Sequence, residues 1–212
     1  MTGEGRPALS REHIAETALR LTEDSGLAGL SMRKLGAELG VEAMSLYHYV
    51  ANKDDLLDAM LDLLYGEVEL PRDVGDDEWE QAIRDGLTSF RQVLLRHSAA
   101  IELFASRPPP TERALEVLYW SYRRFELVGL SPEDSLLAFR FIVSFVMGNA
   151  ANEIGVMGRS DDDLIDLDSL SDPALRNFLI VRRSVGEPAY FDVGLDVVIA
   201  GLRARFNLPD PR

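Results

Sequence analysis

The sequence predicts an all-helical (all-α) fold, with a small N-terminal domain over residues 1–56 and a larger C-terminal domain over residues 57–212. Apolar residues recur every three or four positions through most of the chain, which is the spacing of amphipathic helices rather than strands. Ser, Asn or Asp precedes several of these segments and Gly follows them, as is typical of helix ends. The segments are short up to residue 50 and longer from residue 77, which indicates two unequal domains.

Three short helices are predicted in the N-terminal domain. The first begins after Ser10, a residue type that caps helix N-termini, and ends at Gly26, which suits a left-handed C-terminal cap. Ser31 begins the second helix and Gly40 ends it. A tight turn then leads to a third helix over residues 43–50.

A fourth helix is predicted to connect the two domains. Asn52 and Asp55 have capping-box spacing at its start, and Leu56, Met60 and Leu64 belong to its apolar stripe. Longer helices follow. The first is expected to begin at Asp77, which forms a second capping box with Glu80, and the next after prolines 108–110. The remaining helices are expected to begin at Pro132, reaching about Ile154, at Pro173 and at Pro188. Residues 159–172 contain six Asp and one Arg, which favours a solvated acidic loop.

Composition limits the possible functions. The chain has no cysteine, so disulfides and thiolate metal sites are excluded, and residues 1–10 do not resemble a signal segment. The strongly apolar stretch over residues 141–151 is shorter than the roughly 18 residues needed to span a bilayer. We therefore expect a cytoplasmic protein without a membrane partner. The net charge of −14 disfavours non-specific binding of nucleic acid, so any DNA binding needs a local basic patch.

Residues 30–57 have the pattern of a helix-turn-helix, with two short helices joined by a turn at residues 40–42. In this motif the first helix supports the second as it enters the major groove of DNA. The aromatic run Leu46-Tyr47-His48-Tyr49-Val50, followed by Asn52-Lys53 and a leucine-rich helix, resembles the DNA-binding domain of the TetR family. Three further segments resemble the regulatory domain of the tetracycline repressor type within this family: Ser106-Arg107-Pro108, Gly129-Leu130-Ser131 and Gly186-Glu187-Pro188-Ala189.

The resemblance implies a DNA-binding transcriptional regulator, of the repressor kind, that a small-molecule inducer releases from its operator. Arg33 matches a base-contacting arginine, and its planar guanidinium suits the O6 and N7 atoms of guanine. Tyr47, Tyr49 and Lys53 match positions that contact the DNA backbone. The full set of expected DNA-binding residues is Ser31, Met32, Arg33, Ala43, Met44, Ser45, Tyr47, Tyr49 and Lys53.

Alternatives remain open at this surface. Tyr47 is also of a type that packs inside a small domain, and packing between helices is the expected role of His48. Residues 1–58 contain six Lys or Arg and ten Asp or Glu, a net charge of −4, and Asp54-Asp55 replaces positions that are often basic in the family. This acidity motivates a second hypothesis, in which a protein of the same fold acts through a protein partner without binding DNA.

The C-terminal domain is expected to bind the inducer and to form the dimer. By resemblance, the candidate ligand-binding residues are Phe90, Leu103, Phe104, Ser106, Trp120, Phe141, Met147, Asn149 and Asn152, although aromatic residues at helical spacing also occur in ordinary cores. Leu103 and Gly86 stand where the tetracycline repressor has a metal-binding histidine and a drug-binding asparagine, so we expect a larger, apolar or aromatic inducer and no metal or cofactor.

A homodimer is expected because one helix-turn-helix reads only half of a symmetric operator. The helices near residues 132–154 and 188–206 are the candidates for its interface, where Gly194 and Gly201 would let helices approach closely, unless they are ordinary glycines of the fold. An enzyme is not expected, because the chain has none of the common catalytic or phosphate-binding motifs and only three histidines.

Overall fold

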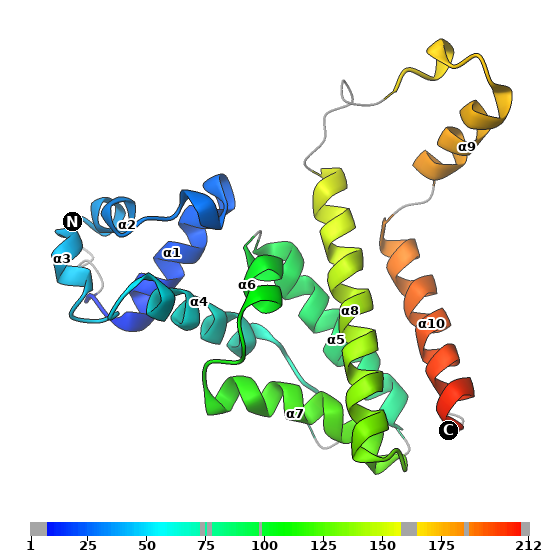
Figure 1. The fold of residues 1–212 in the computed structure, drawn as a ribbon, viewed down its shortest axis with the longest axis horizontal. Coiled ribbons are helices and arrows are strands. Elements are labelled where there is room, and N and C mark those ends of the chain that lie inside the picture. Colours follow the sequence, from blue (N-terminus) through cyan, green and yellow to red (C-terminus); the bar gives the residue numbers. More distant parts are fainter. Residues whose placement is uncertain are drawn as a thin grey trace, which may run out of the picture.

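The computed structural model describes residues 8–72, 75, 78–97, 99–157, 165–184 and 187–208, and all regular elements within these ranges are helices. Figure 1 shows α1, α2 and α3 grouped at one end, and α4 leading from them to the larger group formed by α5 to α8 and α10. Helix α9 lies on an arm that stands apart from the other helices. The predicted all-helical fold, with a small N-terminal part and a larger C-terminal part, is confirmed.

The first two helices begin and end where the sequence predicts. Helix α1 spans Arg11–Ser25, and the Ser10 hydroxyl accepts a hydrogen bond from the His13 amide. Helix α2 spans Met32–Leu39, capped in the same way by Ser31. At its end Gly40 has a φ of 60° and a ψ of 40°, a left-handed conformation that glycine adopts without a steric penalty. A short 3₁₀ helix that was not predicted, η1 over Leu27–Gly29, joins α1 to α2.

Helix α3 is shorter than predicted. It spans Ala43–Leu46, whereas the sequence favoured a helix over residues 43–50. Residues 47–49 form a turn instead, held by hydrogen bonds such as that from the Tyr49 amide to the Leu46 carbonyl. Leu46 and Val50, on either side of this turn, are both fully buried.

Helix α4, over Lys53–Glu67, connects the two parts of the fold. The Asn52 side chain caps it by accepting from the Asp55 amide, which is the first bond of the predicted capping box. In the second bond, the Asp55 carboxylate accepts from the amide of Ala51 instead of that of Asn52. Along its length α4 packs against α1 and then against α6 and α7. The predicted domain boundary after residue 56 therefore falls inside one continuous helix.

The larger part is built around α8, which spans Pro132–Met157 and packs against α5, α6, α7 and α10. Trp79 and Phe125 are buried at the centre of this part, with their ring centroids 6.4 Å apart. The other helices of this group are α5 (Trp79–Arg96), α6 (Ala100–Ser106), α7 (Glu112–Leu127) and α10 (Glu187–Phe206).

Several details differ from the expectation. Helix α6 was not predicted, because its N-terminal residue Ala99 gives no side-chain capping signal. The expected capping residue Asp77 lies outside the described residues. The acidic segment 159–172 was predicted to be a loop, but its described portion contains η4, a 3₁₀ helix over Leu167–Ser169. Helix α9 follows over Pro173–Ser184, close to its predicted start.

Helix α8 contains a stretch, Pro132–Gly155, that is long and apolar enough to cross a membrane by length and composition. The expectation that its apolar stretch is too short was therefore wrong. A single helix of this kind is weak evidence for a membrane span, because core helices of soluble proteins pass the same test. Here one face of α8 is buried against its neighbours, through Ala138, Ile142, Val146 and Ala150, which are spaced four residues apart.

Candidate DNA-binding surface and ligand cavity

Helices α2 and α3 lie unusually close together. A Cβ atom added at Gly36 would be 2.9 Å from the Val41 carbonyl oxygen and 3.2 Å from the Ala43 Cα atom. The Val41 amide also donates to the Gly36 carbonyl at 2.9 Å, which holds the turn between the helices. Glycine at residue 36 therefore allows the start of α3 to pack closely against α2.

The expected DNA-binding residues lie on or near the surface of this motif. Met44 is 73% exposed, Tyr47 43% and Tyr49 41%, while Leu46 and Val50 of the same segment are fully buried. The alternative that Tyr47 packs inside the domain is therefore wrong. His48 was expected to pack between helices and is exposed instead. Arg33 and Lys53 are also exposed, and half-buried positions are occupied by Ser31, Met32, Ala43 and Ser45.

Two lysines gather near the N-terminus of α2. Lys34 Nζ donates to the Gly29 carbonyl at 2.8 Å, and Lys53 Nζ donates to the Leu30 carbonyl at 3.0 Å. These bonds hold two ammonium groups beside a helix end whose amides already favour anions. The arrangement supplies a local positive region in a domain that is acidic as a whole, and exposed Arg33 in the first turn of α2 adds to it.

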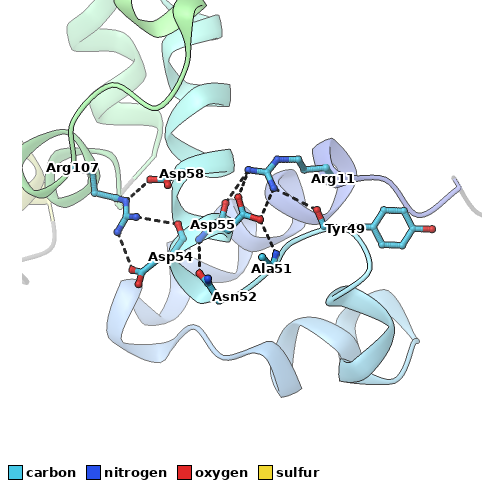
Figure 2. A network of polar contacts seen from close by, with 8 residues as sticks. All are labelled: Arg11, Tyr49, Ala51, Asn52, Asp54, Asp55, Asp58 and Arg107. Atoms are coloured by element: carbon cyan, nitrogen blue, oxygen red, sulfur yellow. Dashed lines mark hydrogen bonds and ion pairs between the residues drawn. The ribbon is translucent and has the colours of Figure 1, made fainter.

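An ion-pair network holds the turn after α3 against the start of α4 (Figure 2). Arg11 binds the Asp55 carboxylate with both terminal nitrogens, at 2.6 and 2.8 Å, and donates to the Tyr49 carbonyl at 3.4 Å. The Ala51 amide donates to the same carboxylate at 2.7 Å. The hydrogen bond from Arg11, followed by that from Ala51, lowers the pKa of Asp55 below its ordinary value. The network thus fixes the backbone that carries the exposed Tyr49 side chain.

Sequence reasoning missed Arg11, which lies 44 residues before Asp55. No local spacing connects these two residues, since the pair exists only because α1 packs against α4. On the other side of α4, Asp54 and Asp58 bind Arg107 of the α6–α7 connection. The adjacent acidic residues Asp54 and Asp55, which motivated the protein-partner hypothesis, are therefore both paired within the chain.

A cavity of about 230 Å³ lies in the larger part of the fold. We call it the ligand cavity. Most of its wall is apolar, and Arg107 is the single charged residue among the described residues that line it. Its lining residues are Tyr65, Val68, Leu70, Gly86, Leu87, Phe90, Phe104, Arg107, Pro109, Val117, Leu118, Ser121, Phe139, Val143 and Met147.

Three of the expected ligand-binding residues, Phe90, Phe104 and Met147, line this cavity. The Phe104 ring contacts Phe90 and Tyr65 edge to face, with centroids 5.0 and 4.9 Å away. Trp120 lies behind Gly86 and lines a second hollow of about 630 Å³, where the Arg124 guanidinium stacks on its ring at 4.5 Å. The ligand cavity and this second hollow share Tyr65, Val68, Leu70 and Val117.

The other expected residues lie elsewhere. Leu103 is fully buried in the core. The exposed Ser106 hydroxyl donates to the Glu102 carbonyl of its own helix. Phe141 is 61% exposed, and Asn152 is exposed as well. Asn149 is buried and accepts from Arg91 at 3.3 Å. None of these residues lines the ligand cavity. Their places in the sequence do not show which face of a helix meets a cavity.

The tyrosine and arginine of the cavity wall were also missed. Tyr65 and Arg107 come from the end of α4 and from the α6–α7 connection, two segments far apart in the sequence. Burial raises the pKa of the Tyr65 phenol to about 12, so this group is a neutral hydroxyl at physiological pH. Among the residues that the structure describes, no cluster of three or more His, Asp or Glu is arranged to hold a metal ion.

Comparison with known proteins identifies the chain. Residues 14–60 match the family of bacterial regulatory proteins of the tetR type, and residues 70–206 match the tetracyclin repressor-like C-terminal domain. An HTH-type transcriptional regulator of Saccharopolyspora erythraea is 31% identical, over 96% of this chain and 88% of that protein. The class C tetracycline repressor protein of Escherichia coli is 30% identical, over 92% and 90%.

Solved structures agree. ActR of Streptomyces coelicolor, in complex with actinorhodin, superposes with a TM-score of 0.77 at 27% identity, covering 93% of this chain and 98% of that one. The helix-turn-helix, the cavity-containing helical domain and these similarities lead to the same conclusion. The chain belongs to the TetR family of bacterial regulators, and it is a helix-turn-helix transcriptional regulator that binds DNA.

Proposed function

We propose that this regulator is a cytoplasmic homodimeric repressor that binds operator DNA through α2 and α3 and leaves it when an apolar or aromatic inducer enters the ligand cavity. The observation that carries the proposal is the exposure of the expected DNA-contacting side chains. Met44, Tyr47 and Tyr49 are exposed, although Leu46 and Val50 of the same segment are fully buried. Leaving three large apolar or aromatic side chains in water is unfavourable unless a partner covers them.

The expected roles differ along this surface. Arg33 would contact a base edge, while Tyr47, Tyr49 and Lys53 would contact phosphate or sugar, with Ser31, Met32 and Ser45 nearby. Ala43 and Met44 cannot form paired hydrogen bonds with a base, so at these positions the operator would be read through apolar contacts such as thymine methyl groups. The small number of basic groups implies few phosphate contacts and a shallow dependence of affinity on salt.

The dimer is supported by exposed apolar residues on α8 and α10, two helices that run side by side along one edge of the protein (Figure 1). Phe141 is 61% exposed, Val193 62% and Val197 66%. A second copy would cover this face. The dimer would then hold its two helix-turn-helix motifs at the spacing of successive major grooves. Gly194 serves packing within one chain, because a Cβ there would be 2.5 Å from the Phe145 ring, whereas Gly201 has open space around it.

The cavity wall supports the proposal of an apolar or aromatic inducer. Phe90, Phe104 and Met147 present aromatic and thioether groups, and the few polar groups there are Tyr65, Ser121 and Arg107. ActR, a structural neighbour, was solved with actinorhodin. An apolar or aromatic compound suits such a wall, whereas Leu103 cannot bind the metal ion that accompanies tetracycline. The protein has no catalytic role in this proposal, and needs no cofactor.

A gel-shift experiment tests the proposal. The wild type is titrated against its own upstream intergenic DNA with unrelated DNA as competitor, beside Arg33→Ala and the control Arg20→Ala, which removes an exposed arginine of α1 outside the helix-turn-helix. We expect a selective shift that Arg33→Ala weakens about tenfold or more and Arg20→Ala preserves, since a bidentate base contact contributes about 1–3 kcal/mol. Absence of any selective shift by a folded dimer at low salt would instead support action through a protein partner.

A further inference from the structure

Arg107 connects the ligand cavity to the helix that leads to the DNA-binding domain. It is the charged residue of the described cavity wall, and it stands at the C-terminal end of α6. Its Nε donates to the Asp58 carboxylate at 2.8 Å, and its Nη1 to the Asp54 carboxylate at 3.2 Å (Figure 2). Its Nη2 donates to the Asp54 carbonyl at 3.0 Å. One guanidinium is thus shared between the edge of the cavity and the first turns of α4.

The two carboxylates hold Arg107 loosely. The Asp54 side chain is 81% exposed and that of Asp58 38%, while that of Arg107 is only 19% exposed. Ion pairs with exposed carboxylates are weak because water and salt screen them. An anion placed in the apolar cavity would meet the same guanidinium in surroundings of lower polarity, where Coulomb attraction is stronger. Exchange of the aspartates for such an anion is therefore energetically accessible.

A neighbouring contact provides an internal reference. Asp62, one helical turn beyond Asp58, binds Thr111, which caps α7, and Arg113 in the first turn of α7. Arg113 therefore clamps α4 as Arg107 does, yet it does not line the ligand cavity. It lines the second hollow instead. Comparing the two arginines separates an effect of the cavity from a general effect of clamping α4.

We propose that Arg107 binds an acidic group of the inducer, so that the ligand is an apolar aromatic compound carrying a carboxylate or a similar acid, and that Asp54 and Asp58 compete with the ligand for this guanidinium. This inference rests on the proposed function, in that the cavity is the ligand site. Occupation by the acid draws Arg107 away from α4, and α4 then loses its tie to the α6–α7 connection. By linkage, the state in which α4 is held by Arg107 binds an acidic ligand less tightly.

The test uses two fluorescent probes that differ by one acidic group, 8-anilinonaphthalene-1-sulfonate and its uncharged counterpart N-phenyl-1-naphthylamine. Each is titrated into the full-length protein. We expect Arg107→Gln to weaken sulfonate binding about fivefold or more, the lower end of ordinary coupling effects, and to leave the uncharged probe nearly unaffected. Arg113→Gln is expected to change neither affinity. Asp54→Asn combined with Asp58→Asn should strengthen binding of the sulfonate alone, because the competing charges are gone.

Several results would overturn the inference. Equal weakening of both probes by Arg107→Gln would mean that the change altered the cavity's shape, and no change at all would place the sulfonate elsewhere. Selective loss of the sulfonate in Arg113→Gln would assign the anion to the second hollow. Thermal unfolding of each variant and retention of sulfonate binding in Arg107→Lys check that the fold is intact. The titrations need no DNA, so they test the acid site independently of the gel shift. A failed gel shift would reject the proposed function, whereas a failed titration would reject only the acid site.

Discussion

Asp55 is the point at which the start of α4 is tied to the turn after α3, and its replacement by Asn has a predictable cost. The change keeps the size of the side chain and removes its charge. Two contacts weaken, namely the bidentate pair with Arg11 and the bond from the Ala51 amide. Because the side chains of Arg11 and Asp55 are 45% and 31% exposed, the pair contributes only about 0.5–1 kcal/mol. Loss of charge assistance in the backbone bond adds about 0.5–1 kcal/mol.

We therefore expect Asp55→Asn to lower the free energy of unfolding by about 1–2 kcal/mol at neutral pH. Urea unfolding followed by circular dichroism measures it, at one fixed protomer concentration, because association would otherwise change apparent stability. The pKa of Asp55 is lowered in the folded state, so its contribution is present above the ordinary pKa of 3.8 and disappears as the pH falls through the lowered folded value. The difference between wild type and variant should shrink accordingly at acid pH.

Asp54→Asn is the matched control. Asp54 is adjacent and is also paired with an arginine, but its side chain is 81% exposed and its carboxylate contact is 3.2 Å long. Its replacement should cost less than about 0.5 kcal/mol, the size expected for a screened surface pair. Equal destabilisation by the two changes, or a difference for Asp55→Asn that persists unchanged below pH 3, would refute the assignment of this stability to the Asp55 network.

Two further changes address the DNA surface and the dimer. Met44→Ala should weaken operator binding roughly fivefold, as expected for losing about 1 kcal/mol of apolar contact, and uracil in place of thymine should then affect the variant less than the wild type in the same gel shift. An equal uracil effect would contradict a methyl contact by Met44. Phe141→Arg should turn the proposed dimer into a monomer in sedimentation velocity and abolish selective DNA binding, whereas Leu115→Arg, at an exposed position of α7, should do neither. A Phe141→Arg variant that stays dimeric would exclude this face as the interface.

Helix α4 is held by arginines from both parts of the fold. Arg11 holds its first turn from the side of the DNA-binding domain, and Arg107 holds the same turn from the side of the ligand cavity (Figure 2). Asp54 and Asp55 are adjacent in sequence, so a shift of α4 that breaks one contact strains the other. In our proposal, a change at the cavity reaches the turn that carries Tyr49 through a single helical turn, and we expect a coupling energy of about 1–3 kcal/mol, the size usual for allosteric proteins.

Local signals in the sequence were enough to place most helices. Ser10, Ser31 and Asn52 cap the helices they were expected to begin, and Gly26 and Gly40 follow α1 and α2. Capping works through hydrogen bonds within three residues, so it can be read from neighbouring letters. The third helix was predicted too long, since it ends at Leu46 in a turn that no capping or glycine signal marks. Helix α6 was missed because it begins without a capping residue.

The sequence by itself thus determined the helical class, the helix-turn-helix and the family resemblance, all of which depend on short-range patterns. It also located Phe90, Phe104 and Met147, which do line the cavity. Only the tertiary structure decided that Phe141 faces outward, that Asn149 is bound by Arg91, and that Arg107 joins the cavity wall to α4. Such contacts connect residues some 50 or more positions apart. Their geometry depends on how whole helices pack against one another, and no local pattern in the sequence records it.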